Sequence, residues 1–217
     1  MPSSLDAPSI VRFHDRELLR PGWPLPPRAA RLPGAWYWID ANHRCNCLLW
    51  REEDKARRLE VEAAEIAAGK RLIDQYNQQR NDAVEAIDEA ILSGLAGVAR
   101  AADARLSSET AGAMVDRLSI LALKIHHMRM QAQRLDAGAS HVDACAAKLA
   151  RLAAQRHDLA QCLDQLLAEA ANGRAYFKVY RQFKMYNDPA LNPWLYGRAA
   201  GSASAAGAAP APGKAAP

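Results

Sequence analysis

Residues 70–91, KRLIDQYNQQRNDAVEAIDEAI, constrain the fold of this chain more strongly than any other stretch. At the roughly 100° per residue of an α-helix, the apolar side chains gather on one face and the acidic and amide side chains gather on the opposite face. The apolar set is Leu72, Ile73, Tyr76, Ala83, Val84, Ile87, Ala90 and Ile91. The polar set is Asp74, Asn77, Gln78, Asn81, Glu85 and Asp88. The pattern predicts an amphipathic helix that buries one side.

One cation interrupts the apolar face of this helix. Arg80 lies between Tyr76 and Val84 on the helix surface. Because a guanidinium group keeps its proton, a buried Arg80 needs a carboxylate or a bound anion beside it. The alternative is that Arg80 extends along the edge of the fold and reaches solvent.

A second stretch, residues 107–128, is apolar on nearly all sides, which is typical of a central helix. Its interruptions are Asp116, Arg117, Lys124 and His127. Asp116 is the natural partner of Arg80, because each charge would compensate the other in the interior.

These charged residues support two hypotheses. In the first, cations hold an anionic sugar phosphate or nucleotide in a helical pocket by charge-assisted hydrogen bonds, and the candidates are Arg57, Arg80, Arg117 and Lys124. In the second, the cations form a structural network with Glu53, Asp54, Asp74 and Asp116. Ligand binding requires an open pocket that reaches Arg80, whereas a structural network does not.

Glu85 and Asp88 form an ExxD pair on one helix face. At this spacing two carboxylates can hold one Mg²⁺. A solvated acidic face explains the same pattern. Mg²⁺ is therefore the one cofactor that the sequence suggests, and it suggests no catalytic residue.

The remaining patterns predict an all-α fold, an elongated bundle in one domain at residues 36–197. Its four main helices are expected at residues 36–57, 63–99, 110–135 and 140–171. Whether residues 58–62 break the chain between the first two helices stays open. The inward side of the last helix is expected to include Val142, Cys145, Leu149, Leu152, Leu159, Leu163, Leu166 and Leu167.

Less regular segments flank the predicted helices. A proline-rich arm at residues 1–35 is expected to be partly disordered, with a short helix at residues 10–19. The aromatic segment at residues 176–196 is predicted to form a short helix to about Met185, then an irregular segment, and to pack across the bundle. Residues 198–217 contain mostly Ala, Gly, Ser and Pro and are predicted to be disordered.

Composition narrows the class of protein. The 217 residues are 50% hydrophobic, which is enough for one sizeable core. Arg198 and Lys214 carry part of the +4 net charge in the tail, so no basic stripe is left to favour a nucleic-acid partner. No transmembrane segment or secretory signal is expected, and the location is predicted to be cytoplasmic.

Four cysteines without a CxxC motif are expected to be buried free thiols: Cys45, Cys47, Cys145 and Cys162.

Four motifs follow one another along the chain: WREEDKAR at 50–57, KRLIDQYNQQRNDAVEAID at 70–88, SETAGAMVDRLSILALKIHHM at 108–128 and KVYRQFKMYNDPALNPWLY at 178–196. Together they resemble the bacterial domain-of-unknown-function family number 4254, over roughly residues 37–196. The resemblance points to the following candidate site residues: Trp50, Glu53, Asp54, Arg57, Asp74, Asn77, Arg80, Glu85, Asp88, Asp116, Lys124, His127, Lys184, Asn187 and Asn192.

Genes of this family often lie beside glycosyltransferases of envelope glycan or lipopolysaccharide assembly. The resemblance therefore implies a cytoplasmic accessory protein of cell-envelope polysaccharide or lipopolysaccharide biosynthesis, with glycosyltransferases or other envelope-glycan proteins as partners. The alternative is an all-α enzyme or ligand-binding protein for an anionic sugar phosphate or nucleotide. The sequence does not decide between enzyme and binding protein, and it leaves a homo-oligomer open.

Overall fold

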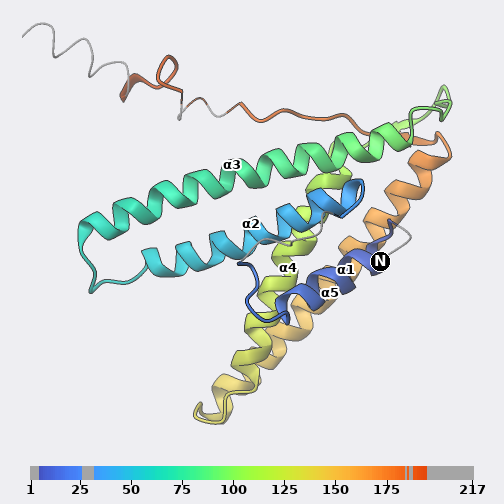
Figure 1. Ribbon diagram of the computed structural model, residues 1–217. Coiled ribbons are helices and arrows are strands. Elements are labelled where there is room, and N and C mark those ends of the chain that lie inside the picture. The colour runs from blue at the N-terminus through green and yellow to red at the C-terminus, as the bar shows by residue number, and fades with distance from the viewer. Residues whose placement is uncertain (1–4, 26–31, 184, 186–187, 195–217) are drawn as a thin grey trace, which may run out of the picture. The chain divides into compact units, whose positions relative to one another are not determined.

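The structure is a computed structural model that describes residues 5–25, 32–183, 185 and 188–194 (Figure 1). Residues up to Tyr180 form one compact unit, and residues from Arg181 onward form another. Within its described part, the first unit consists of five helices and two very short strands. The prediction of an all-α fold is confirmed.

The helices pair into two hairpins. They are α1 (Ala7–Leu18), α2 (Ala35–Ala56), α3 (Ala63–Gly94), α4 (Ala111–Ala132) and α5 (Ala139–Ala171). Helix α2 runs antiparallel to α3, α4 runs antiparallel to α5, and α1 packs against α4 and α5 (Figure 1). The predicted bounds agree to within a few residues except at the end of α3, which stops at Gly94 instead of residue 99 because glycine is a poor helix former.

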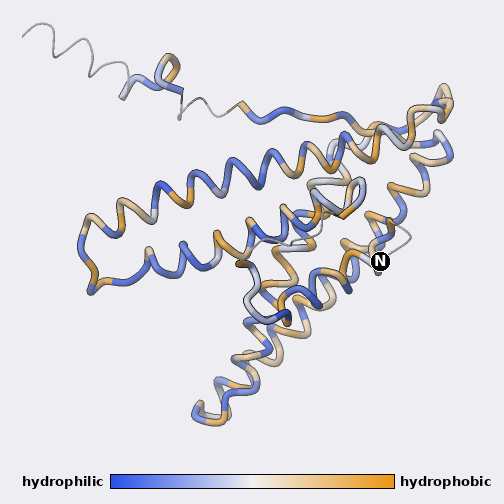
Figure 2. The backbone as a smooth tube through the Cα atoms, in the orientation of Figure 1, coloured by the Kyte–Doolittle hydropathy of each residue, from blue (hydrophilic) through white to orange (hydrophobic). Residues whose placement is uncertain are grey.

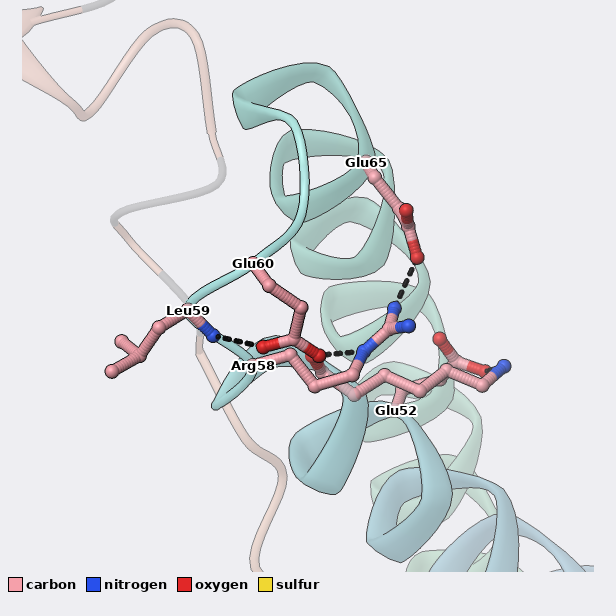
Figure 3. Close-up of polar contacts among 6 residues, drawn as sticks. Glu52, Arg58, Leu59, Glu60 and Glu65 are labelled. Atoms are coloured by element: carbon pink, nitrogen blue, oxygen red, sulfur yellow. Dashed lines mark hydrogen bonds and ion pairs between the residues drawn. The ribbon is translucent and has the colours of Figure 1, made fainter.

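The chain breaks between α2 and α3, at the residues where the sequence left the question open. The guanidinium of Arg58 binds the carboxylate of Glu65, in the first turn of α3. The backbone N–H of Leu59 donates to the carboxylate of Glu60 at 3.0 Å (Figure 3). The N–H of Leu59 thus has a side-chain acceptor in place of the carbonyl that a continuous helix would supply.

Asp88 joins α3 to the beginning of α4. Its carboxylate accepts the backbone N–H of Gly112 at 2.6 Å, and the residue is only 2% exposed. Position 112 needs glycine, because a Cβ there would lie 2.4 Å from the carbonyl oxygen of Val84. Burial raises the pKa of Asp88 to about 6, against the hydrogen bonds from Thr110 and Gly112, which lower it. The prediction of a solvated acidic face is therefore wrong at Asp88, which caps a helix in the interior.

The segment after α5 returns to the loop before α4. Strand β2 (Ala175–Tyr176) lies parallel to β1 (Arg105–Leu106), and the N–H of Ser107 donates to the carbonyl of Tyr176 at 2.8 Å. Phe177 follows and is buried in the core. The prediction of a short helix from residue 176 to Met185 is wrong, because this backbone bonds to the neighbouring loop and residues 177–183 are not helical.

The hydrophobic core of the first unit forms where α1 meets the other helices. Ile10 and Phe13 of α1 are fully buried and belong to the same cluster as Ile39, Leu118 and Leu163. In Figure 2 hydrophilic and hydrophobic residues alternate along each helix. No helix in the described part of the chain is both long enough and apolar enough to cross a membrane.

Several predictions concern the flanking segments and the thiols. In the second unit, Asp188 and Asn192 each accept a backbone N–H two residues further on, as expected for an irregular segment that contains Pro189 and Pro193. Residues 26–31 of the arm and the tail at 198–217 lie outside the described residues. Three of the four free cysteines are buried as predicted, and the fourth is exposed: Cys162.

Candidate ligand site

A pocket of about 430 Å³ opens between α2, α3 and α4. We call it the Arg80 pocket. It is lined by Asn46, Leu49, Trp50, Glu53, Asp54, Arg57, Asn77, Arg80, Ile120 and Leu123. Six of these were predicted as site residues: Trp50, Glu53, Asp54, Arg57, Asn77 and Arg80. The helices bring these residues together because the positions recur every three or four residues along each helix.

The guanidinium of Arg80 faces Asp116 through its Nε and leaves its terminal amino groups available to the pocket. Its Nε lies 3.8 Å from Oδ1 of Asp116, and the two side chains are 29% and 13% exposed. This Nε is buried without a hydrogen bond. Apart from the pair with Asp116, the guanidinium has no hydrogen bond or ion pair with a described residue. Arg80 and Asp116 therefore meet as the sequence suggested, but the guanidinium is only partly buried and keeps donors available for a ligand.

Two asparagines that the sequence analysis missed hold Asp116 in place. The side-chain amides of Asn42 and Asn46 both donate to Oδ1 of Asp116 at 2.9 Å. Asn46 also donates to the hydroxyl of Ser119 at 3.0 Å. The available signal was the spacing of these two amides, which are four residues apart and so share one face of the helix, and buried amides need partners.

A buried histidine–serine pair lies behind the pocket. Nδ1 of His43 is 2.7 Å from the hydroxyl of Ser119, which is the distance of a nucleophile–base pair. Both residues are fully buried, and burial lowers the pKa of His43 to about 3. Because no substrate reaches the hydroxyl and the imidazole does not take up a proton near neutral pH, this pair is part of the core.

The neighbouring thiols are equally unsuited to nucleophilic chemistry. Burial raises the pKa of Cys45 to about 11 and that of Cys47 to about 12. Both thiols are therefore protonated at neutral pH, and the thiolate is the reactive form. What the Arg80 pocket offers is a set of hydrogen-bond donors and acceptors rather than a nucleophile.

The charges in the Arg80 pocket are balanced. The guanidinium of Arg57 lies 3.4 Å from the carboxylate of Glu53 and 3.6 Å from that of Asp54. These three side chains are well exposed, so their ion pairs contribute little stability and can rearrange around a ligand. Trp50 adds a broad apolar wall beside them.

The other predicted site residues lie elsewhere. Lys124 and His127 line a neighbouring pocket that shares Trp50 with the first. Surface ion pairs occupy Asp74, with Lys70, and Arg117, with Glu109. Glu85 is half-buried on α3. Lys184 and Asn187 lie outside the described residues.

The proposed metal ligands do not form a cluster. Asp88 is committed to the N–H of Gly112, as described above. Among the residues that the structure describes, no group of three or more histidine, cysteine, aspartate or glutamate side chains is placed to hold a metal ion.

Fold and site together define an all-α helical bundle with a polar pocket between its helices. Residues 36–179 match the family described as "Protein of unknown function (DUF4254)", and the chain belongs to this family. The resemblance drawn from the four motifs is thereby confirmed. No curated protein and no solved structure was found to match the chain.

Proposed function

We propose that this protein binds a small ligand that carries both hydroxyl groups and an anionic group, of the class of sugar phosphates and nucleotides, in the Arg80 pocket. The observation that carries the proposal is the free end of Arg80, which is presented to an open pocket. An open pocket that reaches Arg80 is the feature that distinguishes ligand binding from a purely structural network.

Each part of such a ligand has a counterpart in the lining. The terminal amino groups of Arg80 match an anionic oxygen, and the planar fork of a guanidinium binds phosphate in a bidentate manner. The carboxylates of Glu53 and Asp54 accept hydrogen bonds from hydroxyl groups, and the amide of Asn77 both donates and accepts. The ring of Trp50 offers an apolar surface to a sugar or base face.

This ligand class is compatible with the role that the family resemblance implies. Sugar phosphates and nucleotide sugars are the building blocks of polysaccharides, so a protein that binds them would serve as a cytoplasmic accessory to envelope polysaccharide or lipopolysaccharide assembly. The balanced, nucleophile-free lining supports binding rather than catalysis.

The proposal is tested by thermal unfolding of the purified protein with glucose 1-phosphate, UDP-glucose and UMP. A ligand at a hundredfold excess over its Kd stabilises the folded state by about 2.7 kcal/mol, a readily measured shift. Arg80→Gln should abolish the shift because it removes the anion-binding end of the site.

The matched control is Arg71→Gln, on an exposed position of the same helix and outside the pocket. This variant should keep the full ligand-induced shift. The proposal fails if none of the three compounds stabilises the wild type, or if Arg80→Gln responds as strongly as the wild type does.

A further inference from the structure

A second pocket, of about 500 Å³, lies between α4 and α5. We call it the α4–α5 pocket. It is lined by Trp50, Lys124, His127, Met128, Gln131, Lys148, Arg151, Leu152 and Gln155. Trp50 is the one residue that it shares with the Arg80 pocket. The proposed function makes no use of the other lining residues.

The α4–α5 pocket is cationic. Lys124, Lys148 and Arg151 line it, and no carboxylate is among the described residues of the lining. None of the three forms an ion pair within the described ranges, whereas Arg57 and Arg80 of the first pocket both do. Lys148 and Arg151 are also three residues apart on one helix, where like charges repel. A bound anion would relieve this repulsion and engage all three donors.

The interior of the α4–α5 pocket is apolar. Met128 and Leu152 line it and are only half-buried, so their apolar side chains are accessible to a ligand. Trp50 and His127 add a flat aromatic wall, with their rings stacked at 4.6 Å between centroids and 2° from parallel. Burial, followed by the charge of His126, lowers the pKa of His127. The stacked imidazole is therefore neutral at pH 7, and the positive charge comes from the lysines and the arginine.

We infer that the α4–α5 pocket binds an organic anion with an apolar body, such as an aryl or alkyl phosphate or carboxylate. The apolar body packs on Trp50, Met128 and Leu152, and the anionic group meets Lys148, Arg151 and Lys124 at the rim. This site goes beyond the proposed function, because a ligand here needs neither Arg80 nor the carboxylates of the first pocket. The lining of the Arg80 pocket is balanced in charge and that of the α4–α5 pocket is cationic and more apolar, so the two favour different anionic ligands.

The test uses 1-naphthyl phosphate as the probe and isothermal titration calorimetry as the measurement, with 1-naphthol as the uncharged comparison. The wild type should bind the phosphate at least tenfold more tightly than the naphthol, and binding should weaken as salt is added. The double variant Lys148→Gln/Arg151→Gln should lose at least tenfold in affinity. Both side chains are exposed and without ion pairs in the structure described, so the variant should fold normally.

Two further variants serve as controls. Arg129→Gln removes one charge from the exposed side of α4 outside the pocket and should leave the affinity unchanged, because a general loss of positive charge is not what weakens binding. Arg80→Gln should also leave it unchanged, so the two sites fail or succeed independently.

Three outcomes would overturn the inference. The first is equal affinity of the wild type and the double variant for 1-naphthyl phosphate. The second is equal affinity of the wild type for 1-naphthol and for the phosphate. The third is a dimer in analytical ultracentrifugation that Lys148→Gln/Arg151→Gln converts to a monomer, because the pocket would then be a contact between two copies of this chain.

Discussion

His14 offers the sharpest test of the buried polar groups in this fold. Its ring is fully buried, stacks on His43 at 4.5 Å between centroids, and neither ring nitrogen has a hydrogen-bond partner within the described residues. Burial, followed by the charges of His43 and Arg156, holds the pKa of His14 well below its ordinary value. The imidazole is therefore neutral in the folded state, and His14→Phe should make the protein more resistant to acid.

The magnitude follows from proton linkage. The pKa of histidine is about 6.5 in the unfolded chain, so the unfolded state gains a proton below that pH while folded His14 does not. The free energy of unfolding is therefore unaffected by His14 above pH 6.5 and falls below it, by about 1.36 kcal/mol per pH unit, or about 2 kcal/mol by pH 5. The variant has no imidazole at this position, so its free energy of unfolding does not fall for this reason. The advantage of His14→Phe over wild type should therefore be about 2 kcal/mol larger at pH 5 than at pH 7.

The measurement is urea unfolding followed by far-UV circular dichroism at both pH values. Any change in packing from the phenyl ring alters the free energy of unfolding equally at the two pH values, so it cancels when the advantage at pH 7 is subtracted from that at pH 5. His157→Gln, on the exposed side of α5, removes an imidazole without touching the core and serves as the control. An advantage of equal size at pH 5 and pH 7 would refute the reasoning, because it would mean that folded His14 takes up a proton as readily as the unfolded chain does.

Three further predictions concern the helix contacts and use the same unfolding assay. Gly112→Ala should cost about 3 kcal/mol, because its Cβ would lie 2.4 Å from the backbone oxygen of Val84; a loss below about 0.5 kcal/mol would contradict the tight contact. Burial raises the pKa of Asp88 to about 6, so the folded state binds this proton more tightly than the unfolded state, and the resulting stability is lost as the pH rises through 6. The stability of wild type relative to Asp88→Asn should therefore rise by about 2 kcal/mol from pH 7 to pH 4, and a constant difference would exclude a raised pKa. Arg80→Gln should cost only about 1 kcal/mol, because the pair with Asp116 is partly exposed; a loss of about 3 kcal/mol or more would indicate a sealed ion pair.

Local chemistry in the sequence was sufficient to predict most helix ends. Thr110 caps α4, with its hydroxyl accepting the N–H of Ala113 at 3.2 Å, at the residue where that helix was expected to begin. Asn172 and Gly173 follow the last residue of α5, directly after the expected end at residue 171, and Gly173 adopts a φ of 70°. The return of residues 175–176 to the loop before α4 depends on a partner strand about 70 residues away, which local patterns do not specify.

The residue pattern alone pointed to the candidate site where a charged residue broke an apolar helix face, and the family motifs pointed to the other predicted lining residues. Arg80 and Asp116 stood out because each interrupts an apolar helix face, and the structure brings them together. Asn42 and Asn46 did not stand out, because an amide in a helix of mixed polarity is ordinary until its partner is known. Asp88 was assigned to solvent because the helical wheel of a single helix does not show which neighbouring backbone donors reach its polar side.

The α4–α5 hairpin is anchored at one end only, and its local stability should decline along its length. The strand pair β1–β2 and the core side chains Leu159 and Leu163 hold one end, whereas Cys145 is the only buried residue from His126 to Asp158, all of which the structure describes. Backbone amides near the turn at residues 133–138 should therefore exchange with solvent through small local openings, and those near the strand pair only through global unfolding. The α4–α5 pocket lies in the half of the hairpin with few buried residues. A ligand bound there would contact both helices and lower the rate at which they open locally at that end.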